Sequence, residues 1–380
     1  MSKEWDAKSN YIFKVVSDID GVKEIINIPY NFLLRKYEVL AKYNLPMGKH
    51  ILKLNLLNPD KIGDIILRDI IIYGIKFLKM SISKLVVIGS ANTDMVIKAE
   101  KLPLPGETIL GGTFFMNAGG KGANQAVAAA RLGGDVTLVA KVGNDIFGKG
   151  TIEGLKSENI NTNFVLVDDG VPSGTALIML NEEGENCIMV APGANANLLP
   201  GDIDLVKNLH EAEIILMQLE IPMETILSVV KNAKINGQKI IINPAPAQVL
   251  ENEILNGLFL LTPNEIEATL LTGINVEDEV TASGAADIFL SKGVQHVIIT
   301  LGKQGAYFKS NELEFSVKAP IVKAMDSTAA GDTFIGALSV AVTEKMDWKK
   351  AVEFAVQAAS ISVTRLGAQA SVPYRNEILI

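Results

Sequence analysis

The residues with the clearest chemical potential lie at positions 326–334, in the string Asp-Ser-Thr-Ala-Ala-Gly-Asp-Thr-Phe. An apolar helical pattern follows at once, so these small residues stand at a helix start, where backbone N–H groups lack helical partners. The amides of Ala329, Ala330, Gly331 and Asp332 are therefore expected to hold an anion, such as a phosphoryl group in transfer. Asp332 stands where a carboxylate can accept the proton of an attacking hydroxyl, although it could also serve only as a helix cap.

A second string, Ala-Gly-Gly-Lys-Gly-Ala-Asn at 118–124, opens another helical pattern after an extended segment. Paired glycines let a backbone approach a ligand closely, and Lys121 and Asn124 offer donors to hydroxyls or phosphate. The glycine spacing before Lys121 does not match the P-loop pattern, so a nucleotide must be bound in another way. A loop without chemistry could contain the same glycines, and only the full string makes the ligand-binding interpretation specific.

The elements that must position these strings alternate between short apolar strands and amphipathic helices from residue 84 onward. Six runs have the composition of strands buried on both faces: 84–89, 136–142, 212–218, 239–243, 257–262 and 296–301. Helical periodicity marks 122–132, 147–158, 223–236, 265–271, 282–292, 331–345 and 348–364. This order predicts an α/β fold around a mainly parallel sheet.

Two stretches break the alternation, near 94–116 and 162–190. Both are extended, interrupted by polar residues and rich in turn signals. They are expected to form antiparallel lid strands outside the main sheet, which would cover a small substrate and exclude water.

Together, the two strings and the order of elements give a chain that resembles the PfkB carbohydrate kinases, and among them the ribokinases, over residues 81–380. The resemblance also includes 88–94, 191–195, 217–220, 243–246, 262–267, 300–302 and 364–371. It implies a ribokinase-like three-layer sandwich and ATP-dependent phosphorylation of the 5-hydroxyl of D-ribose, giving D-ribose 5-phosphate and ADP.

Two alternatives to this function stay open. A kinase for deoxyribose, another sugar or a nucleoside would have the same fold and machinery. A non-catalytic sugar sensor is disfavoured because Asp332 and the glycine beside it are present.

The resemblance also implies residues for the sugar and the nucleotide. The implied sugar-binding residues are Asn92, Asp94, Gly120, Lys121, Asn124, Glu220 and Asp332. The implied nucleotide-binding residues are Asn264, Thr300, Gly302, Gly305 and Gly331. Taken singly, Asn92 and Asp94 could form an Asx-turn, Glu220 could cap the helix near Pro222, and Gly305 could belong to a plain turn.

Two ions complete what the resemblance implies. Glu267 lies three residues after Asn264 and is expected to act on Mg²⁺ through water, because Mg²⁺ keeps most of its own waters. A monovalent cation, K⁺, is expected beside the phosphate-binding amides, at Asp326, Thr328, Ser362, Arg365, Gly367 and Ser371. Several of its ligands would be backbone carbonyls, and Arg365 could instead cap the end of its helix.

The composition fits an enzyme that acts on small molecules. With 380 residues, 48% of them hydrophobic, the chain can bury a large core, and its net charge of -8 argues against a nucleic-acid partner. Charged residues interrupt the most apolar stretch, 62–80, which argues against a membrane-spanning helix. The single cysteine, Cys187, and the absence of a signal-peptide pattern favour the cytoplasm, where a homodimer is expected.

Residues 1–80 have no counterpart in the resemblance and form an unassigned N-terminal segment. Positions 62–77 show a helical pattern that is apolar on two sides, and such a helix needs a partner to bury it. The segment could dock on the kinase domain, mediate dimerisation, be the remnant of another domain, or reflect the chosen start of the sequence.

Overall fold

Two units make up the chain in the computed structural model, Met1–Ile75 and Lys76–Ile380. The structure describes residues 12–19, 22–29, 52–56, 83–183 and 185–378. Within the described part of the first unit, β1 (Ile12–Ile19), β2 (Val22–Pro29) and β3 (Leu52–Leu56) form an antiparallel sheet in the order β2-β1-β3. The helical pattern at 62–77 and the apolar stretch 62–80 lie outside the described residues.

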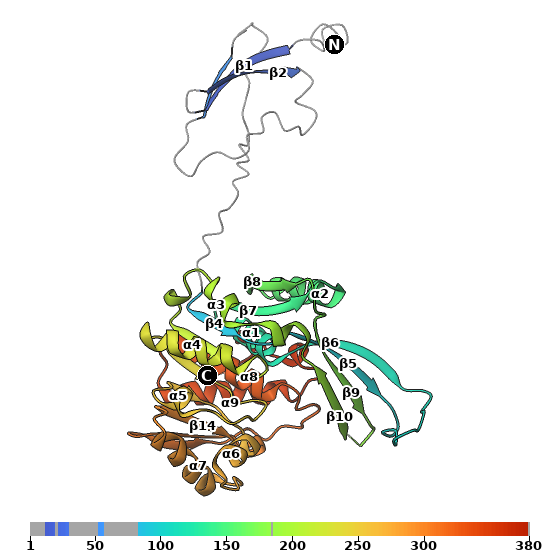
Figure 1. Ribbon diagram of the computed structural model, residues 1–380, viewed down its shortest axis with the longest axis vertical. Coiled ribbons are helices and arrows are strands. Elements are labelled where there is room, and N and C mark those ends of the chain that lie inside the picture. The colour runs from blue at the N-terminus through green and yellow to red at the C-terminus, as the bar shows by residue number, and fades with distance from the viewer. Residues whose placement is uncertain (1–11, 20–21, 30–51, 57–82, 184, 379–380) are drawn as a thin grey trace. The chain divides into compact units, whose positions relative to one another are not determined.

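A large sheet forms the centre of the second unit (Figure 1). Among the described residues it has nine strands in the order β16-β15-β14-β13-β12-β11-β4-β7-β8. Neighbouring strands run parallel from β14 to β8, and β15 and β16 are antiparallel. The strands are β4 (Leu85–Ile88), β7 (Val136–Gly143), β8 (Asn161–Asp168), β11 (Ile214–Met217), β12 (Lys239–Ile242), β13 (Leu260–Leu261), β14 (His296–Thr300), β15 (Ala306–Ser310) and β16 (Glu314–Val317).

Helices cover both faces of this sheet because alternate residues of the central strands point to opposite sides. Val86 and Ile88 of β4 pack with one set of helices, and Leu85 and Val87 pack with the other. The first set is α3 (Pro200–Asp204), α4 (Met223–Ile235), α5 (Asn252–Leu255), α6 (Glu265–Thr272) and α7 (Glu279–Ser291). The second is α1 (Lys121–Arg131), α2 (Ile146–Ser157), α8 (Ala330–Thr343) and α9 (Trp348–Ser362). The expected three-layer α/β sandwich is confirmed.

A smaller sheet projects beyond the large one (Figure 1). In the described part of the chain it has four strands: β5 (Asn92–Lys98), β6 (Thr113–Gly119), β9 (Gly174–Leu180) and β10 (Asn186–Ala191). We call it the lid sheet. Its order is β10-β9-β5-β6, with β5 and β9 parallel and the outer pairs antiparallel.

The lid sheet differs from the sequence-based expectation at one end. Residues 162–168, expected in the lid, belong to β8, which pairs in parallel with β7 at the edge of the large sheet. β8 has a polar start at 161–163 and an apolar run at 164–167, a pattern that suits an edge strand as well as a lid strand, so pattern alone could not separate them. The edge hairpin of β15 and β16 was not predicted at all.

Candidate active site

Asp332 lies in the first turn of α8, and its buried carboxylate accepts hydrogen bonds from two side-chain amides of α1. Its Oδ2 accepts a hydrogen bond from Asn124 Nδ2 at 3.0 Å, and its Oδ1 accepts one from Gln125 Nε2 at 2.9 Å. The N-cap of α8 is Ala329, and no side chain caps the helix. Asp332 is therefore not the helix cap that the sequence left as an alternative.

The backbone before Asp332 presents amides at the positive end of the α8 dipole. Ala329 adopts a left-handed conformation with φ 58°. The amides of Gly331 and Asp332 donate to no atom of the residues that the structure describes, so both can receive an anion. The amide of Ala330 donates to the carbonyl of Ser327 at 3.2 Å. The expectation that the Ala330 amide is free is wrong, because a turn before the helix uses it.

Glu220 follows β11 and holds the start of α1 in place. Its Oε2 accepts from the hydroxyl of Ser90 at 2.5 Å and from the amide of Lys121 at 3.0 Å. No side chain caps α4, which starts after Pro222, so the alternative role of Glu220 as the cap of that helix is wrong. Glu220 instead satisfies the amide of the first residue of α1, whose N-cap is Gly120 with φ 85°.

Asn92 and Asp94 begin β5, at the base of the lid sheet. Asn92 Oδ1 accepts a hydrogen bond from Asn195 Nδ2 at 2.7 Å, and Asn195 Oδ1 accepts from the Ala91 amide at 2.9 Å. The segment is a strand held by Asn195, and the alternative Asx-turn is wrong. The carboxylate of Asp94 accepts no hydrogen bond from the described residues, which leaves it free to accept from a polyol.

The charges of these residues are coupled. Burial raises the pKa of Asp94, the nearby carboxylates of Glu220 and Asp332 add to the rise, and together they bring the pKa to about 6. Asp332 raises the pKa of the buried Lys121 more than burial lowers it, and Glu220 and Glu267 add to the rise. Lys121 is thus held protonated among carboxylates, where a cation can also meet a phosphoryl oxygen.

Asn264 and Glu267 form a capping box at the start of α6. The Glu267 amide donates to Asn264 Oδ1 at 2.8 Å, and the Asn264 amide donates to Glu267 Oε2 at 2.9 Å. Burial raises the pKa of Glu267, against the lowering effect of the Asn264 amide and of Lys121. Glu267 Oε1 and Asn264 Nδ2 make no hydrogen bond within the described residues.

The turn after β14 brings Thr300 beside this capping box. The Thr300 amide donates to the Pro263 carbonyl at 3.0 Å, and Thr300 pairs with Asn264 in an isolated bridge. Gly302 has φ 50°, and a methyl group there would meet nothing closer than 3.6 Å. At Gly305, with φ 108°, a methyl group would lie 1.9 Å from the Val317 carbonyl. Gly305 is therefore required by the β15–β16 hairpin, whether or not it also meets a nucleotide.

Asp326 ties the loop before α8 to the segment after α9. Its Oδ1 accepts from the Thr328 amide at 2.8 Å and its Oδ2 from the Gly367 amide at 2.9 Å. Burial alone would raise the pKa of Asp326, but the hydrogen bonds from Thr328 and Gly367 outweigh it and lower the pKa. The result is an ionised carboxylate that accepts from two backbone amides.

The other residues expected at a monovalent cation contribute differently. The hydroxyls of Ser362 and Ser371 donate to the carbonyls of Ala359 and Ala368, each at 2.8 Å. The Arg365 guanidinium pairs with Glu377, so it neither caps α9 nor faces a cation. Only the Arg365 carbonyl is left as a possible ligand.

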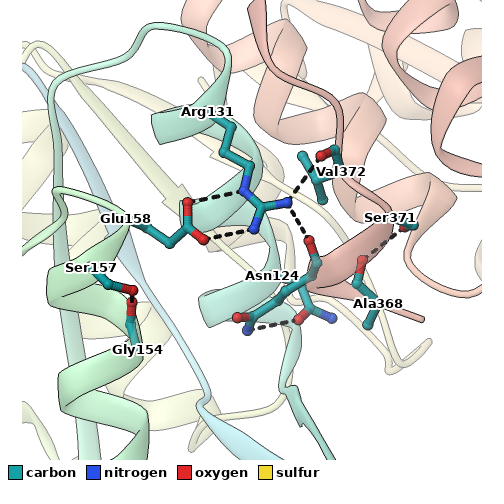
Figure 2. Close-up of polar contacts among 9 residues, drawn as sticks. Asn124, Arg131, Gly154, Ser157, Glu158, Ala368, Ser371 and Val372 are labelled. Carbon is teal, nitrogen blue, oxygen red and sulfur yellow. Dashed lines mark hydrogen bonds and ion pairs between the residues drawn. The ribbon is translucent and has the colours of Figure 1, made fainter. Parts of the chain in front are cut away.

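Arg131, at the end of α1, fastens the C-terminal segment to this site. Figure 2 shows its guanidinium between Glu158 and the carbonyl of Val372. A further hydrogen bond of 2.7 Å reaches the carbonyl of Gln369, whose side chain in turn donates to Asn124 Oδ1 at 3.2 Å. The orientation of the Asn124 amide is thus fixed from outside the site.

The fold brings most of the expected residues to one edge of the large sheet, at the carboxyl ends of its parallel strands. Four residues that hold them were not predicted: Ser90, Gln125, Asn195 and Gln369. Gln125 offered a signal, since it is a polar residue directly after Asn124 on a helix otherwise rich in alanine. Ser90 lies in a loop, Asn195 and Gln369 lie in short 3-10 helices, and the contacts of all three depend on the tertiary fold.

Among the residues that the structure describes, no three His, Cys, Asp or Glu side chains cluster as a metal site. In the same part of the chain, no helix has the length and apolar character needed to cross a membrane.

Residues 82–375 match the family described as pfkB family carbohydrate kinase. A ribokinase of Haemophilus influenzae is 42% identical over 300 residues, which cover 78% of this chain and 97% of the relative. A deoxyribokinase of Salmonella typhi is 38% identical over 289 residues, 76% of this chain and 94% of the relative. The structure of Arabidopsis thaliana ribokinase complexed with ribose and ATP aligns with a TM-score of 0.73 at 34% identity, covering 78% of this chain and 97% of that one.

Proposed function

The chain belongs to the pfkB family of carbohydrate kinases, and on that premise we propose that it phosphorylates the 5-hydroxyl of D-ribose with ATP. The products are D-ribose 5-phosphate and ADP. The observation that carries the proposal is the Asp332 carboxylate, held on both oxygens by amides and placed beside the free amides of α8. Ribose is favoured because the Haemophilus influenzae relative is a ribokinase and the Arabidopsis relative was solved with ribose and ATP.

In the proposed reaction, ribose binds between the lid sheet and the carboxyl ends of the strands. Asp94 and Glu220 accept hydrogen bonds from its hydroxyls and Asn92 donates to them through Nδ2, with Gly120, Lys121 and Asn124 completing the site. Asp332 accepts the proton of the 5-hydroxyl as that oxygen attacks the γ-phosphorus. The amides of Gly331 and Asp332, with the Lys121 ammonium, stabilise the charge that grows on the phosphoryl oxygens.

ATP is proposed to bind along Asn264, Thr300 and Gly302, with its γ-phosphate toward Gly331. The free oxygen of Glu267 fits a magnesium ion held through water, since Mg²⁺ uses few carboxylates and keeps several waters. When bound there, Mg²⁺ would neutralise charge on the β- and γ-phosphates.

The test of this function is an ATP-consumption assay over ribose, deoxyribose, fructose and adenosine. We expect ribose to have the highest kcat/KM, by at least about tenfold, which is about 1.4 kcal/mol of transition-state preference. The deoxyribokinase relative makes deoxyribose the main competitor. A tenfold preference for any other acceptor would replace ribose as the substrate while leaving the kinase chemistry in place.

A monovalent cation, K⁺, is proposed to bind at the loop held by Asp326. Its support is the ionised Asp326 carboxylate, which accepts from the Gly367 amide of the segment that holds Ser362, Arg365, Gly367 and Ser371, because a large cation prefers several oxygen ligands. The ion would stiffen the loop that carries Thr328 and the α8 amides. Replacing K⁺ by tetramethylammonium at constant ionic strength should lower kcat several-fold. An unchanged rate, after residual K⁺ is removed, would exclude a functional ion.

The lid sheet is proposed to form the interface of a homodimer. One face of the lid sheet leaves Phe114, Met116, Leu177 and Met189 between 53% and 73% exposed, a large apolar patch for a monomer.

Residues 81–380 are proposed to carry the activity without the N-terminal segment. A protein starting at Met80 should keep the full chain's kcat/KM for ribose within about threefold. Light scattering should give the mass of two chains for both proteins. A monomer, or a tenfold loss of activity on truncation, would contradict the corresponding part.

A further inference from the structure

We propose that Gln125 is a positioning residue that fixes the orientation of the Asp332 carboxylate, and that Gln218 and Asn243 fix Gln125 in turn. The inference rests on the proposed role of Asp332 as the base that accepts the ribose proton. None of the three side-chain amides is expected to touch the sugar, because all three lie behind the Asp332 carboxylate, away from the proposed ribose site. They form a chain of side-chain amides that we call the amide ladder.

The direction of every hydrogen bond in the amide ladder is set from one end. Asn243 Nδ2 donates to the Thr262 carbonyl at 3.0 Å, and a carbonyl can only accept. Asn243 must therefore present Oδ1 to Gln125, which donates to it through Nε2 at 3.0 Å. The same Nε2 then has its second hydrogen for Asp332 Oδ1, at 2.9 Å. Asp332 Oδ1 therefore always faces a hydrogen-bond donor.

Gln218 forms the other end of the amide ladder. With Nε2 committed twice, Gln125 turns its Oε1 to Gln218, whose Nε2 donates to it at 2.5 Å. Both Nε2 hydrogens of Gln125 and its Oε1 are therefore engaged in hydrogen bonds. An amide fixed at both ends cannot flip, so the donor to Asp332 cannot become an acceptor.

Within the described part of the chain, Gln218 has an unpaired buried acceptor, which lowers the free energy of unfolding. It is fully buried, and its Oε1 accepts no hydrogen bond from the described residues. A buried acceptor without a partner costs about 1–3 kcal/mol, but an apolar side chain at position 218 would move that cost to Gln125 Oε1, which would lose its donor. Gln218 thus satisfies the acceptor of Gln125 while its own acceptor has no partner among the described residues.

The helix packing sets the distance between Gln125 and Asp332. Gly336 lies one turn after Asp332 on α8, and a methyl group there would be 2.5 Å from the Ala128 Cβ and 2.8 Å from the Gln125 carbonyl. The missing side chain lets α8 press against α1 at this turn. Asn124 and Gln125 are thus brought onto opposite oxygens of one carboxylate.

Without Gln125, only Asn124 would hold Asp332, and a carboxylate with one donor can rotate away from the attacking hydroxyl. A misplacement of about 1 Å can cost on the order of 100-fold in rate. We expect Gln125→Met to lower kcat by roughly 10- to 100-fold while the KM for ribose changes less than about threefold. The matched control is Gln238→Met, which removes an amide that also donates twice, to the carbonyls of Leu209 and Ala212, far from Asp332. It should lower stability without changing kcat.

A double-mutant cycle separates this role from a general effect on the site. In the Asp332→Asn background, Gln125→Met should lower the residual single-turnover rate by no more than about twofold, because there is no base left to position. A fall as large as in the wild-type background would overturn the inference, since Gln125 would then act elsewhere. If Asp332→Asn itself keeps its kcat, the proposed function fails rather than the amide ladder.

Gln218→Met tests the inference even if Gln125→Met does not fold. This change keeps Gln125 and removes its outer hydrogen bond, so the unpaired buried acceptor moves from Gln218 Oε1 to Gln125 Oε1. The expected result is a Tm that changes little, together with a kcat lowered about two- to fivefold at constant KM. An unchanged kcat would overturn the amide ladder, and so would a lower Tm that accounts for the loss of activity.

Discussion

Asp332→Asn is expected to lower kcat for ribose phosphorylation by at least about 100-fold, with the Kd for ribose changed less than about fivefold. Asparagine keeps the shape, and its Oδ1 can accept from only one of Asn124 and Gln125, but it cannot take a proton from the 5-hydroxyl. Single-turnover kinetics and calorimetric titration of ribose measure the two quantities separately.

The control for this prediction is Asp347→Asn. Asp347 is a true helix cap, whose Oδ1 accepts from the Lys350 amide at 3.1 Å at the start of α9. It should leave kcat unchanged. Near-normal turnover in Asp332→Asn would mean that the Asp332 carboxylate only organises α1 and α8.

Asp94→Asn is expected to stabilise the protein at pH 8 while damaging its activity. The pKa of Asp94 is about 6 in the folded protein, against 3.8 as the ordinary value, so the folded state binds the proton more tightly. The ionised carboxylate therefore destabilises the fold fully above about pH 6 and not at all below about pH 4. Removing the charge should raise the free energy of unfolding by roughly 1–3 kcal/mol at pH 8. At pH 4 the gain should vanish.

The loss of activity follows from the same carboxylate. A hydrogen bond to a charged acceptor is worth about 1.5–3 kcal/mol, so kcat/KM for ribose should fall roughly 10- to 100-fold in Asp94→Asn. In the wild-type enzyme kcat/KM should fall as the pH drops through about 6, and this limb should be missing in the variant. Denaturant unfolding and initial rates across pH 4–8 measure both effects. A variant that is less stable at pH 8, or equally active, would remove Asp94 from the sugar site.

The sequence predicted the central sheet and most helices because their apolar residues recur with the period of the element. The runs around Leu85–Ile88 and Ile214–Met217 are buried on both faces, and only a central parallel strand needs that pattern. β13 lies within the predicted run 257–262 but has only two residues, and β16, which is partly exposed, gives no strong periodic signal.

The sequence pointed to charged residues that the fold brings together, such as Asp94, Lys121, Glu220 and Asp332, but not to the polar residues that hold them. Asp332 was marked by the helix start around it, whereas Asn195 and Gln369 act across more than 100 residues of sequence. Nor could the sequence show that the Ala330 amide closes a turn or that Arg365 pairs with Glu377, because both depend on local backbone geometry.

The most direct measurement of the central claim is the position of the phosphate in the product. Purified protein incubated with ATP, Mg²⁺ and [¹³C]ribose would be followed by ³¹P and ¹³C NMR. We predict phosphorus coupling to C5 of ribose, in amounts equal to the ADP formed, and no such product with Asp332→Asn. ATP consumption without a ribose phosphate, or phosphate attached at another carbon, would contradict the account.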